Sequence, residues 1–243
     1  MYIVMGISEP RHIERHQKEI SSIRDFVFGF GDGINTSLGI VAGVGGADVS
    51  SNIIILAAIV AMFTGAKAMA VQNYLAVKAQ TQLLHSEIER EKWEMENVPE
   101  AERQEIVDVY RAKGFSGNEL EVIVNKITSD KKVWLDTMLT EELKLNLEII
   151  GSPLKSAFRM FGSFLVGGIL PIIPYFFAHG YVPLLVAIAI SLSASFVIGA
   201  AKSRLANLSI IRGGFEMAGL GTGIALLGFG IGSELANIGI LKL

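Results

Sequence analysis

The stretch FVFGFGDGINTSLGIVAGVGG, from Phe26 to Gly46, decides the fold of this chain. It is apolar and rich in glycine, and it has about the 20 residues that a helix needs to cross the hydrocarbon core of a membrane. Asp32 lies inside it, between two glycines. Because a charged side chain within a span is costly, such acids usually face the interior of a helix bundle or an aqueous path. The stretch therefore predicts a membrane helix that carries a functional carboxylate.

The rest of the chain has the composition of a membrane protein with one polar insert. Its 243 residues are 51% hydrophobic and include 26 glycines, which is more apolar than a typical soluble domain. Further segments of the required length and hydropathy lie at about 53–77, 154–178, 181–201 and 213–240. We therefore predict an all-α integral membrane protein with five transmembrane helices and a helical cytosolic insert between the second and the third.

The distribution of basic residues predicts the orientation. Lysines and arginines precede the first span and fill the loop between the fourth and the fifth, whereas the loops after the first and third spans have none. By the positive-inside rule, the N-terminus and the insert are cytoplasmic and the C-terminus lies outside. The predicted parts are a cytosolic N-terminal segment at 1–23, transmembrane helices one and two at 24–77, a cytosolic helical domain at 78–152, and transmembrane helices three to five at 153–243.

Helix breakers divide the insert further. The helix of the second span has no breaker before Pro99, so we expect it to continue to that point. Three more helices are then expected at 98–114, 116–129 and 130–150, the last one stopped by Gly151 and Pro153.

Met69 lies at a depth in the second span that matches the depth of Asp32 in the first. At about 1.5 Å per residue, Asp32 is roughly 9 Å and Met69 roughly 12 Å from the cytosolic ends of their spans. A carboxylate and a thioether at one level suit a borderline transition-metal ion better than Mg²⁺ or Ca²⁺. Lys67, close to Met69, either snorkels towards the cytosol or neutralises Asp32 or Glu234.

The insert carries acidic residues at helical spacing. It holds 16 of the chain's 24 Asp and Glu residues between positions 78 and 150. Three pairs are spaced so that each lies on one helix face, namely Glu91 with Glu94, Glu102 with Glu105, and Met138 with Glu142. This spacing is compatible with a divalent-metal site and also with ordinary solvated faces.

Other motifs are few. His12 and His16 form an i,i+4 pair that could also bind metal. The chain has no cysteine and no pattern for catalysis, phosphate binding or nucleic-acid binding, so we expect neither an enzyme nor a nucleic-acid partner. Small residues four apart permit close helix packing, either between two subunits or within one; they occur at Gly39 and Gly43, Gly219 and Gly223, and Gly228 and Gly232.

Five motifs, in order along the chain, resemble the vacuolar iron transporter family. They are RDFVFGFGDGINTSLGIVAGVGGA, GAKAMAVQNYLAVKA, the acidic run with EREKWE and VPEAERQE, WLDTMLTEE, and GGILPIIPYFF. The resemblance implies a proton-coupled exporter of Fe²⁺, and often Mn²⁺, from the cytosol. It implies a homodimer with the ion path between subunits and with Asp32 and Met69 as intramembrane ligands. The cytosolic metal site of the 78–152 domain would comprise Glu91, Glu94, Glu102, Glu105, Met138 and Glu142.

This chain departs from the family pattern at three positions. Leu139 stands where the family has a second methionine, and Ala61 stands where it has a glutamate in the second span. Lys67 adds a cation where the family has an apolar residue. Ala61 and Lys67 favour an alternative, a membrane-tethered metal sensor or buffer that does not transport. The carboxylate-rich insert also suits a transporter of another divalent cation such as Ca²⁺.

The expected partners follow from this reading. They are divalent metal ions, protons, the lipid bilayer and a second copy of the chain. We expect no permanently bound cofactor, and Zn²⁺ or other divalent ions could substitute for the transported Fe²⁺ or Mn²⁺. The membrane would be the plasma membrane in a prokaryote and a vacuolar-type membrane in a eukaryote.

Overall fold

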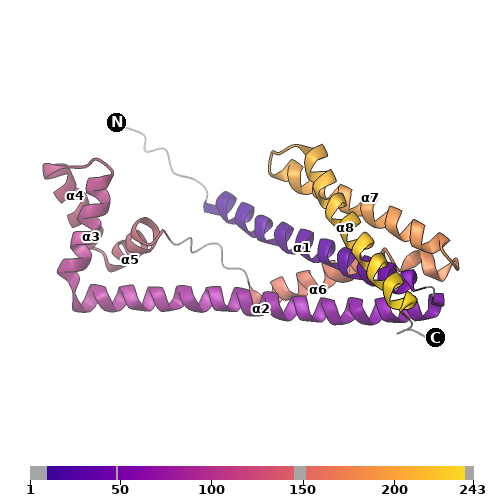
Figure 1. Cartoon of the computed structure of the whole chain (residues 1–243). Coiled ribbons are helices and arrows are strands. Elements are labelled where there is room, and N and C mark those ends of the chain that lie inside the picture. The colour runs from indigo at the N-terminus through magenta and orange to yellow at the C-terminus, as the bar shows by residue number, and fades with distance from the viewer. Residues whose placement is uncertain (1–9, 48, 145–151, 239–243) are drawn as a thin grey trace. The chain divides into compact units, whose positions relative to one another are not determined.

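The computed structural model of the chain describes residues 10–47, 49–144 and 152–238, with side chains from residue 21 onward (Figure 1). Every regular element in these ranges is a helix, as the sequence predicted. The chain divides into two compact units. We call Lys18–Leu75 with Ser152–Leu243 the span unit, and Met1–Gln17 with Ala76–Gly151 the insert unit.

The span unit is built from long apolar helices. Among the described residues, four helices are long and apolar enough to cross a membrane: α1 over Ser21–Gly46, α2, α7 and α8. The full elements are α1 at Pro10–Gly46, α2 at Ser51–Asn97, α7 at Val182–Leu205 and α8 at Ile210–Asn237. Helix α1 thus begins inside the predicted N-terminal segment. The side chains of His12 and His16 lie outside the described ones.

The third predicted span differs from a single long helix. Helix α6, Pro153–Ile169, has 17 residues and is followed by the short 3₁₀ helix η3 at Ile173–Phe176. Pro171 and Pro174 explain the break, because proline lacks the amide hydrogen that a continuing α-helix needs. The count of five spans is therefore not confirmed by helix length, and α6 with η3 is the segment on which it depends.

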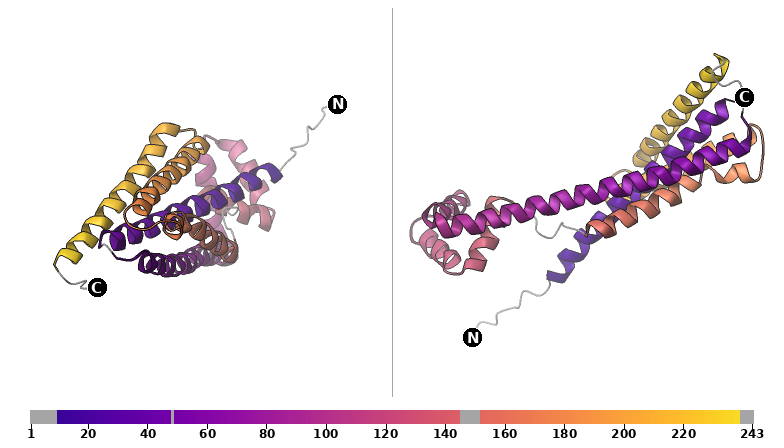
Figure 2. Two further views of the ribbon diagram at one scale, coloured as in Figure 1. Left: turned by 90° about the vertical axis from the view of Figure 1, so that its right-hand side faces the viewer. Right: turned by 90° about the horizontal axis from the view of Figure 1, so that it is seen from below.

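Glycines bring the helices of the span unit close together. A Cβ atom added to Gly228 of α8 would lie 2.7 Å from the carbonyl oxygen of Gly39 in α1, and one added to Gly232 would collide with the backbone of Gly43. These two small-residue pairs therefore pack within one chain. Helices α7 and α8 also run side by side (Figures 1 and 2).

The insert unit is a small helical bundle with its own core. Helices α3 at Pro99–Ala112 and α4 at Gly117–Thr128 lie within two residues of the predicted bounds, and α2 does continue to Asn97. The core side chains come from α2, α3, α4, α5 and η1: Met95, Ile106, Leu120, Val124, Ile127, Trp134 and Met138. This core holds together the helices that carry the candidate ligands.

The last predicted helix of the insert changes its winding where the candidate ligands begin. Asp130 caps α5, Lys131–Thr137, by accepting hydrogen bonds from the amides of Lys132 and Val133 at 2.8 and 3.2 Å. A π-helical turn, η1, then follows at Met138–Glu142, and the amide of Leu143 donates to the carbonyl of Met138 at 3.1 Å. Such turns are frequent at functional sites. Residues 145–150 of the predicted helix lie outside the described residues.

Candidate metal centre

Three carboxylates meet where α2 turns back into α3. Ligand oxygens of Glu91, Glu94 and Glu102 all lie within 4.8 Å of one another. The turn arises at Val98, because the residue before a proline is pushed out of the helical conformation, and Val98 has φ −134° and ψ 48°. The break allows the first turns of α3 to pack against the end of α2. Glu91 and Glu102 are almost fully buried, with 2% and 3% of their surface exposed.

Two more carboxylates belong to the same group. Burial, followed by the charges of Glu105, Glu91, Glu94 and Glu142, raises the pKa of Glu102 to about 7. Burial, followed by the charges of Glu105 and Glu91, likewise raises the pKa of Glu142 to about 7. We call Glu91, Glu94, Glu102, Glu105 and Glu142 the glutamate cluster. Five acids contributed by α2, α3 and η1 therefore act on one another at close range.

The cluster contains carboxylate oxygens that no described protein group satisfies. Buried Oε2 atoms of Glu91, Glu102 and Glu142 have no hydrogen-bond partner among the described residues. Burying a carboxylate without a partner costs several kcal/mol, so such groups are normally paired, protonated or bound to a metal ion. Oxygen-rich sets of this kind suit divalent cations. The arrangement fits a cation-binding site.

Of the two neighbouring positions in η1 where the family pattern has methionines, this chain keeps one methionine, Met138. Met138 is fully buried and belongs to the hydrophobic core of the insert unit. Leu139, also buried, replaces the second methionine of the family pattern. Packing alone accounts for the burial of Met138, so its role as a metal ligand stays a prediction.

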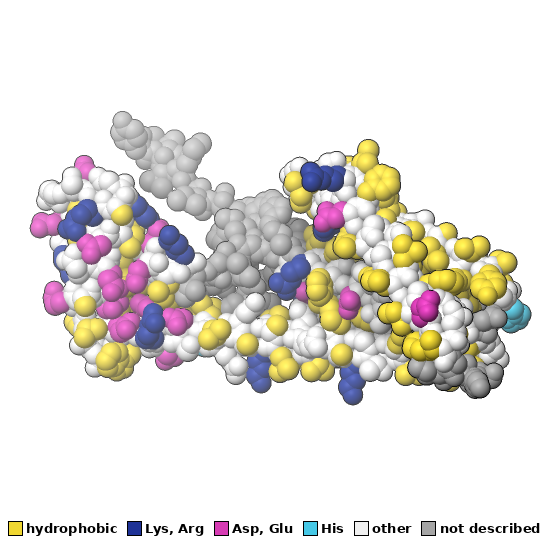
Figure 3. All heavy atoms as spheres, viewed as in Figure 1, with side chains coloured by type: hydrophobic (Ala, Val, Ile, Leu, Met, Phe, Trp, Pro, Cys, Tyr) yellow, Lys and Arg dark blue, Asp and Glu magenta, His cyan; other side chains and the backbone are white. Residues whose placement is uncertain are grey.

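Arg90, next to Glu91 in α2, is a neighbour that the sequence reasoning did not identify. Its guanidinium lies 2.8 Å from Glu87, 3.3 Å from Glu91 and 3.6 Å from Glu94. Figure 3 shows acidic side chains gathered over the insert helices with basic residues among them. Only the i,i+3 and i,i+4 spacing to Glu87 and Glu94 could have indicated this arrangement from the sequence.

The intramembrane candidates lie on two helices of the span unit. Asp32 and Met69 are both half-buried, and Met69 packs against the core of the unit. Phe164 of α6 approaches both Gly33 and Gly65. Asp32 precedes the first of these glycines and Met69 follows the second by one helical turn. The backbone of Phe164 thus lies against α1 next to Asp32, and its ring lies against α2 one turn before Met69. Among the described residues, no side chain forms a hydrogen bond or ion pair with Asp32.

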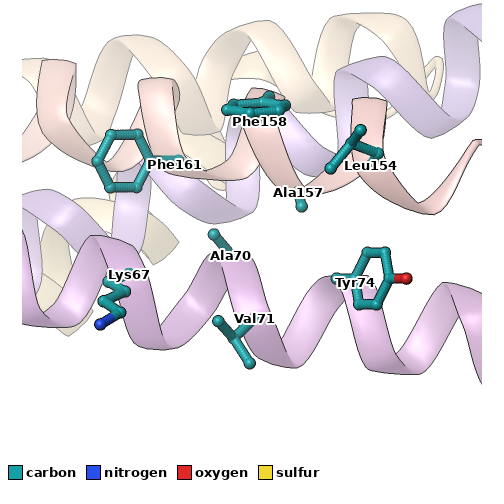
Figure 4. A pocket seen from close by; sticks show the side chains of 8 residues that line it. All are labelled: Lys67, Ala70, Val71, Tyr74, Leu154, Ala157, Phe158 and Phe161. Atoms are coloured by element: carbon teal, nitrogen blue, oxygen red, sulfur yellow. The ribbon is translucent and has the colours of Figure 1, made fainter.

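Lys67 and Ala61 give this region less negative charge than the family pattern. Lys67 is exposed, and within the described ranges it forms no ion pair with Asp32 or Glu234. Figure 4 shows its nitrogen turned away from α6, at one end of an apolar groove of about 300 Å³ between α2 and α6. Neither predicted ion pair, with Asp32 or with Glu234, is therefore formed among the described residues.

A polar network that sequence patterns did not predict connects helices of the span unit near these candidates. Ser156 donates to the buried Asp25 at 2.6 Å, Arg159 donates to the same carboxylate oxygen at 3.0 Å, and Asn73 donates to Ser156 at 2.8 Å. Asp25 lies two turns before Asp32 on α1, and Asn73 lies one turn after Met69 on α2. The network therefore fixes the relative register of the two helices that carry the candidate ligands.

Comparison with known proteins agrees with this picture. The model of the VIT family matches residues 23–233. Vacuolar iron transporter 1 of Arabidopsis thaliana is 31% identical over 86% of this chain and 84% of its own length. The vacuolar iron transporter of Plasmodium falciparum is 31% identical over 93% of this chain and 87% of its own length. Vacuolar iron transporter 2 of Oryza sativa is 29% identical over 93% of each chain. The chain belongs to the vacuolar iron transporter family.

Proposed function

We propose that the protein exports divalent transition-metal ions from the cytosol, Fe²⁺ first and Mn²⁺ as a second cargo, in exchange for protons. The observation that carries the proposal is the glutamate cluster with its three unpartnered, buried carboxylate oxygens. Its occurrence in a chain whose relatives are named vacuolar iron transporters identifies Fe²⁺ as the first ion to test. No permanently bound cofactor is part of the proposal, and Zn²⁺ or another divalent ion could replace the cargo.

The proposed topology has five spans, with α6 and η3 together as the third. The basic residues before the first span and between the last two support a cytoplasmic N-terminus and insert, and an outer C-terminus. The boundaries of the four parts stay at 1–23, 24–77, 78–152 and 153–243. The membrane would be the plasma membrane in a prokaryote or a vacuolar-type membrane in a eukaryote.

The proposed transport cycle begins at the glutamate cluster. Its carboxylates collect the ion on the cytosolic side and raise its local concentration. The ion then passes to Asp32 and Met69, with a second subunit completing the path. Protonation of Asp32 releases the ion, because a neutral carboxylic acid is a poor metal ligand. The polar network around Asp25 keeps Asp32 and Met69 at neighbouring levels throughout.

Metal flux into proteoliposomes under an imposed pH gradient tests this cycle. We expect Mn²⁺ and Fe²⁺ uptake that stops when the gradient collapses and that is lost in Asp32→Asn. Glu216→Gln is the matched control, because Glu216 is an exposed acid of α8 outside the proposed path. Transport by Asp32→Asn at the rate of the unsubstituted protein would contradict the mechanism.

A second function, a membrane-tethered metal sensor or buffer, is favoured by the span unit itself. Ala61 supplies no carboxylate, and Lys67 adds a cation that no described acid neutralises. In that case the purified protein would bind Mn²⁺ at the glutamate cluster, and no ion would cross the membrane under any gradient. Competition with Ca²⁺ in the same assay separates a calcium transporter from one for transition metals.

A further inference from the structure

Arg90 contacts the glutamate cluster through two nitrogens of its guanidinium. Its Nη2 atom lies 3.3 Å from Oε1 of Glu91, and its Nε atom lies 3.6 Å from Oε2 of Glu94. The same Nη2 is 2.8 Å from Glu87, outside the cluster. Half of the arginine side chain is exposed, so it can leave these contacts without becoming buried elsewhere.

These contacts place a cation on two carboxylates that a metal ion would need, and at Glu91 the arginine binds Oε1 while the buried Oε2 stays unpartnered. The Glu91 and Glu94 carboxylates belong to the group whose oxygens lie within 4.8 Å of one another. A divalent ion bound there would repel the guanidinium, and the two cations would compete for the negative charge of the same two carboxylates. In the absence of metal, the guanidinium offsets repulsion among five carboxylates. Arg90 therefore stabilises the metal-free glutamate cluster relative to the cluster with a bound metal ion.

We propose that Arg90 is a built-in competitor that weakens metal binding at the glutamate cluster and so sets its affinity. The proposal rests on the proposed function, since it assumes that the cluster binds divalent metal. A weakly charged or monovalent cation would gain too little to displace the arginine, whereas a divalent ion would gain enough. Arg90 is thus a specificity-determining residue that acts through the carboxylates it contacts.

Lys92 provides a matched comparison on the same helix. It forms an ion pair with Glu89 at 2.7 Å, and both side chains are exposed. Lys92→Gln therefore removes the same charge as Arg90→Gln, two residues away, without freeing an atom of the cluster. A difference between the two variants isolates direct contact from a general change in charge.

The test is calorimetric titration of Mn²⁺ into the full-length protein in detergent micelles at pH 8. We expect Arg90→Gln to bind Mn²⁺ about tenfold more tightly, because two partly exposed charge pairs no longer compete. Lys92→Gln should change the affinity by less than about twofold. Arg90→Lys should fall between these, since one ammonium cannot reach both carboxylates as a planar fork does.

Thermal unfolding supplies a second readout that a merely structural arginine would not reproduce. Arg90→Gln should melt earlier than the unsubstituted protein without metal, and its melting temperature should rise further on adding Mn²⁺. Unchanged or weaker Mn²⁺ binding by folded Arg90→Gln would overturn the inference alone. An unsubstituted protein that binds no Mn²⁺, or whose binding survives Glu102→Gln with Glu142→Gln, would overturn the proposed cluster function itself.

Discussion

Replacing Glu102 by glutamine should stabilise the metal-free insert unit while impairing its metal binding. The pKa of Glu102 rises from an ordinary 4.5 to about 7, chiefly because of burial. Each tenfold change in proton affinity equals about 1.4 kcal/mol, so the ionised side chain costs the folded unit roughly 3 kcal/mol at pH 8. Glutamine keeps the shape and part of the desolvation cost, and we expect a gain of about 1–3 kcal/mol.

The pH dependence gives this prediction its sign. Because the pKa of Glu102 is higher in the folded state than in the unfolded chain, the cost is absent below about pH 4.5. It grows as the pH rises to about 7 and is constant above that value. The advantage of Glu102→Gln should therefore be full at pH 8 and should fall to roughly a quarter of that value at pH 5.

Intrinsic fluorescence measures the relevant unit alone, since both tryptophans of the chain, Trp93 and Trp134, lie in the insert unit. In urea titrations of the full-length protein in micelles, the midpoint for Glu102→Gln should rise by about 1 M at pH 8. Saturating Mn²⁺ should reverse the order, because only the unsubstituted protein gains about 3 kcal/mol at a hundredfold excess over Kd.

The matched control for this experiment is Glu100→Gln. Glu100 is an exposed acid in the first turn of the same helix. Its replacement removes one charge without relieving any burial, and it should cost a few tenths of a kcal/mol through the helix dipole. If Glu102→Gln unfolds at the same or lower urea concentration than the unsubstituted protein at pH 8, the burial argument is wrong.

Three further predictions follow from the same structure. Mn²⁺ binding at the glutamate cluster should tighten by about 10- to 100-fold between pH 6 and pH 8, as two groups with a pKa of about 7 lose their protons; a flat calorimetric profile would argue against the cluster. Asp25→Asn, which leaves Arg159 without its buried carboxylate, should cost about 1–3 kcal/mol in micelle unfolding, and Arg24→Gln at the exposed partner should cost much less. Gly33→Ala would drive a methyl group into the backbone of α6, so that a drop of several degrees in the melting temperature is expected, whereas Gly162→Ala has open space and should be neutral.

Local sequence signals predicted most of the helices. Pro99 ends one helix and begins the next, and the bounds of α3 and α4 follow breakers that any reader of the sequence can see. The third span is a different case. Pro171 and Pro174 are visible in the sequence, but hydropathy averaged over a long window does not register them. A single span was therefore predicted at 154–178, whereas α6 ends at Ile169.

Contacts between residues far apart in the sequence could not be predicted from helical spacing. Helical spacing placed Glu91 with Glu94 and Glu102 with Glu105 on shared faces, but only the turn at Val98 determines that these faces oppose each other. Ser156, which donates a hydrogen bond to Asp25, lies 131 residues further along the chain. No spacing rule connects positions so far apart.

A transporter needs a collecting site whose affinity is limited as well as sufficient. A cluster of five carboxylates, two of them buried, that stayed ionised and unopposed would hold a divalent ion too tightly to pass it on, which suits a buffer better than an exporter. Two features of the insert unit act against such tight binding: protons compete because Glu102 and Glu142 titrate near pH 7, and the guanidinium of Arg90 competes at two ligands. If transport is the function, Arg90→Gln should therefore bind Mn²⁺ more tightly and yet export it more slowly, whereas a buffer would only improve.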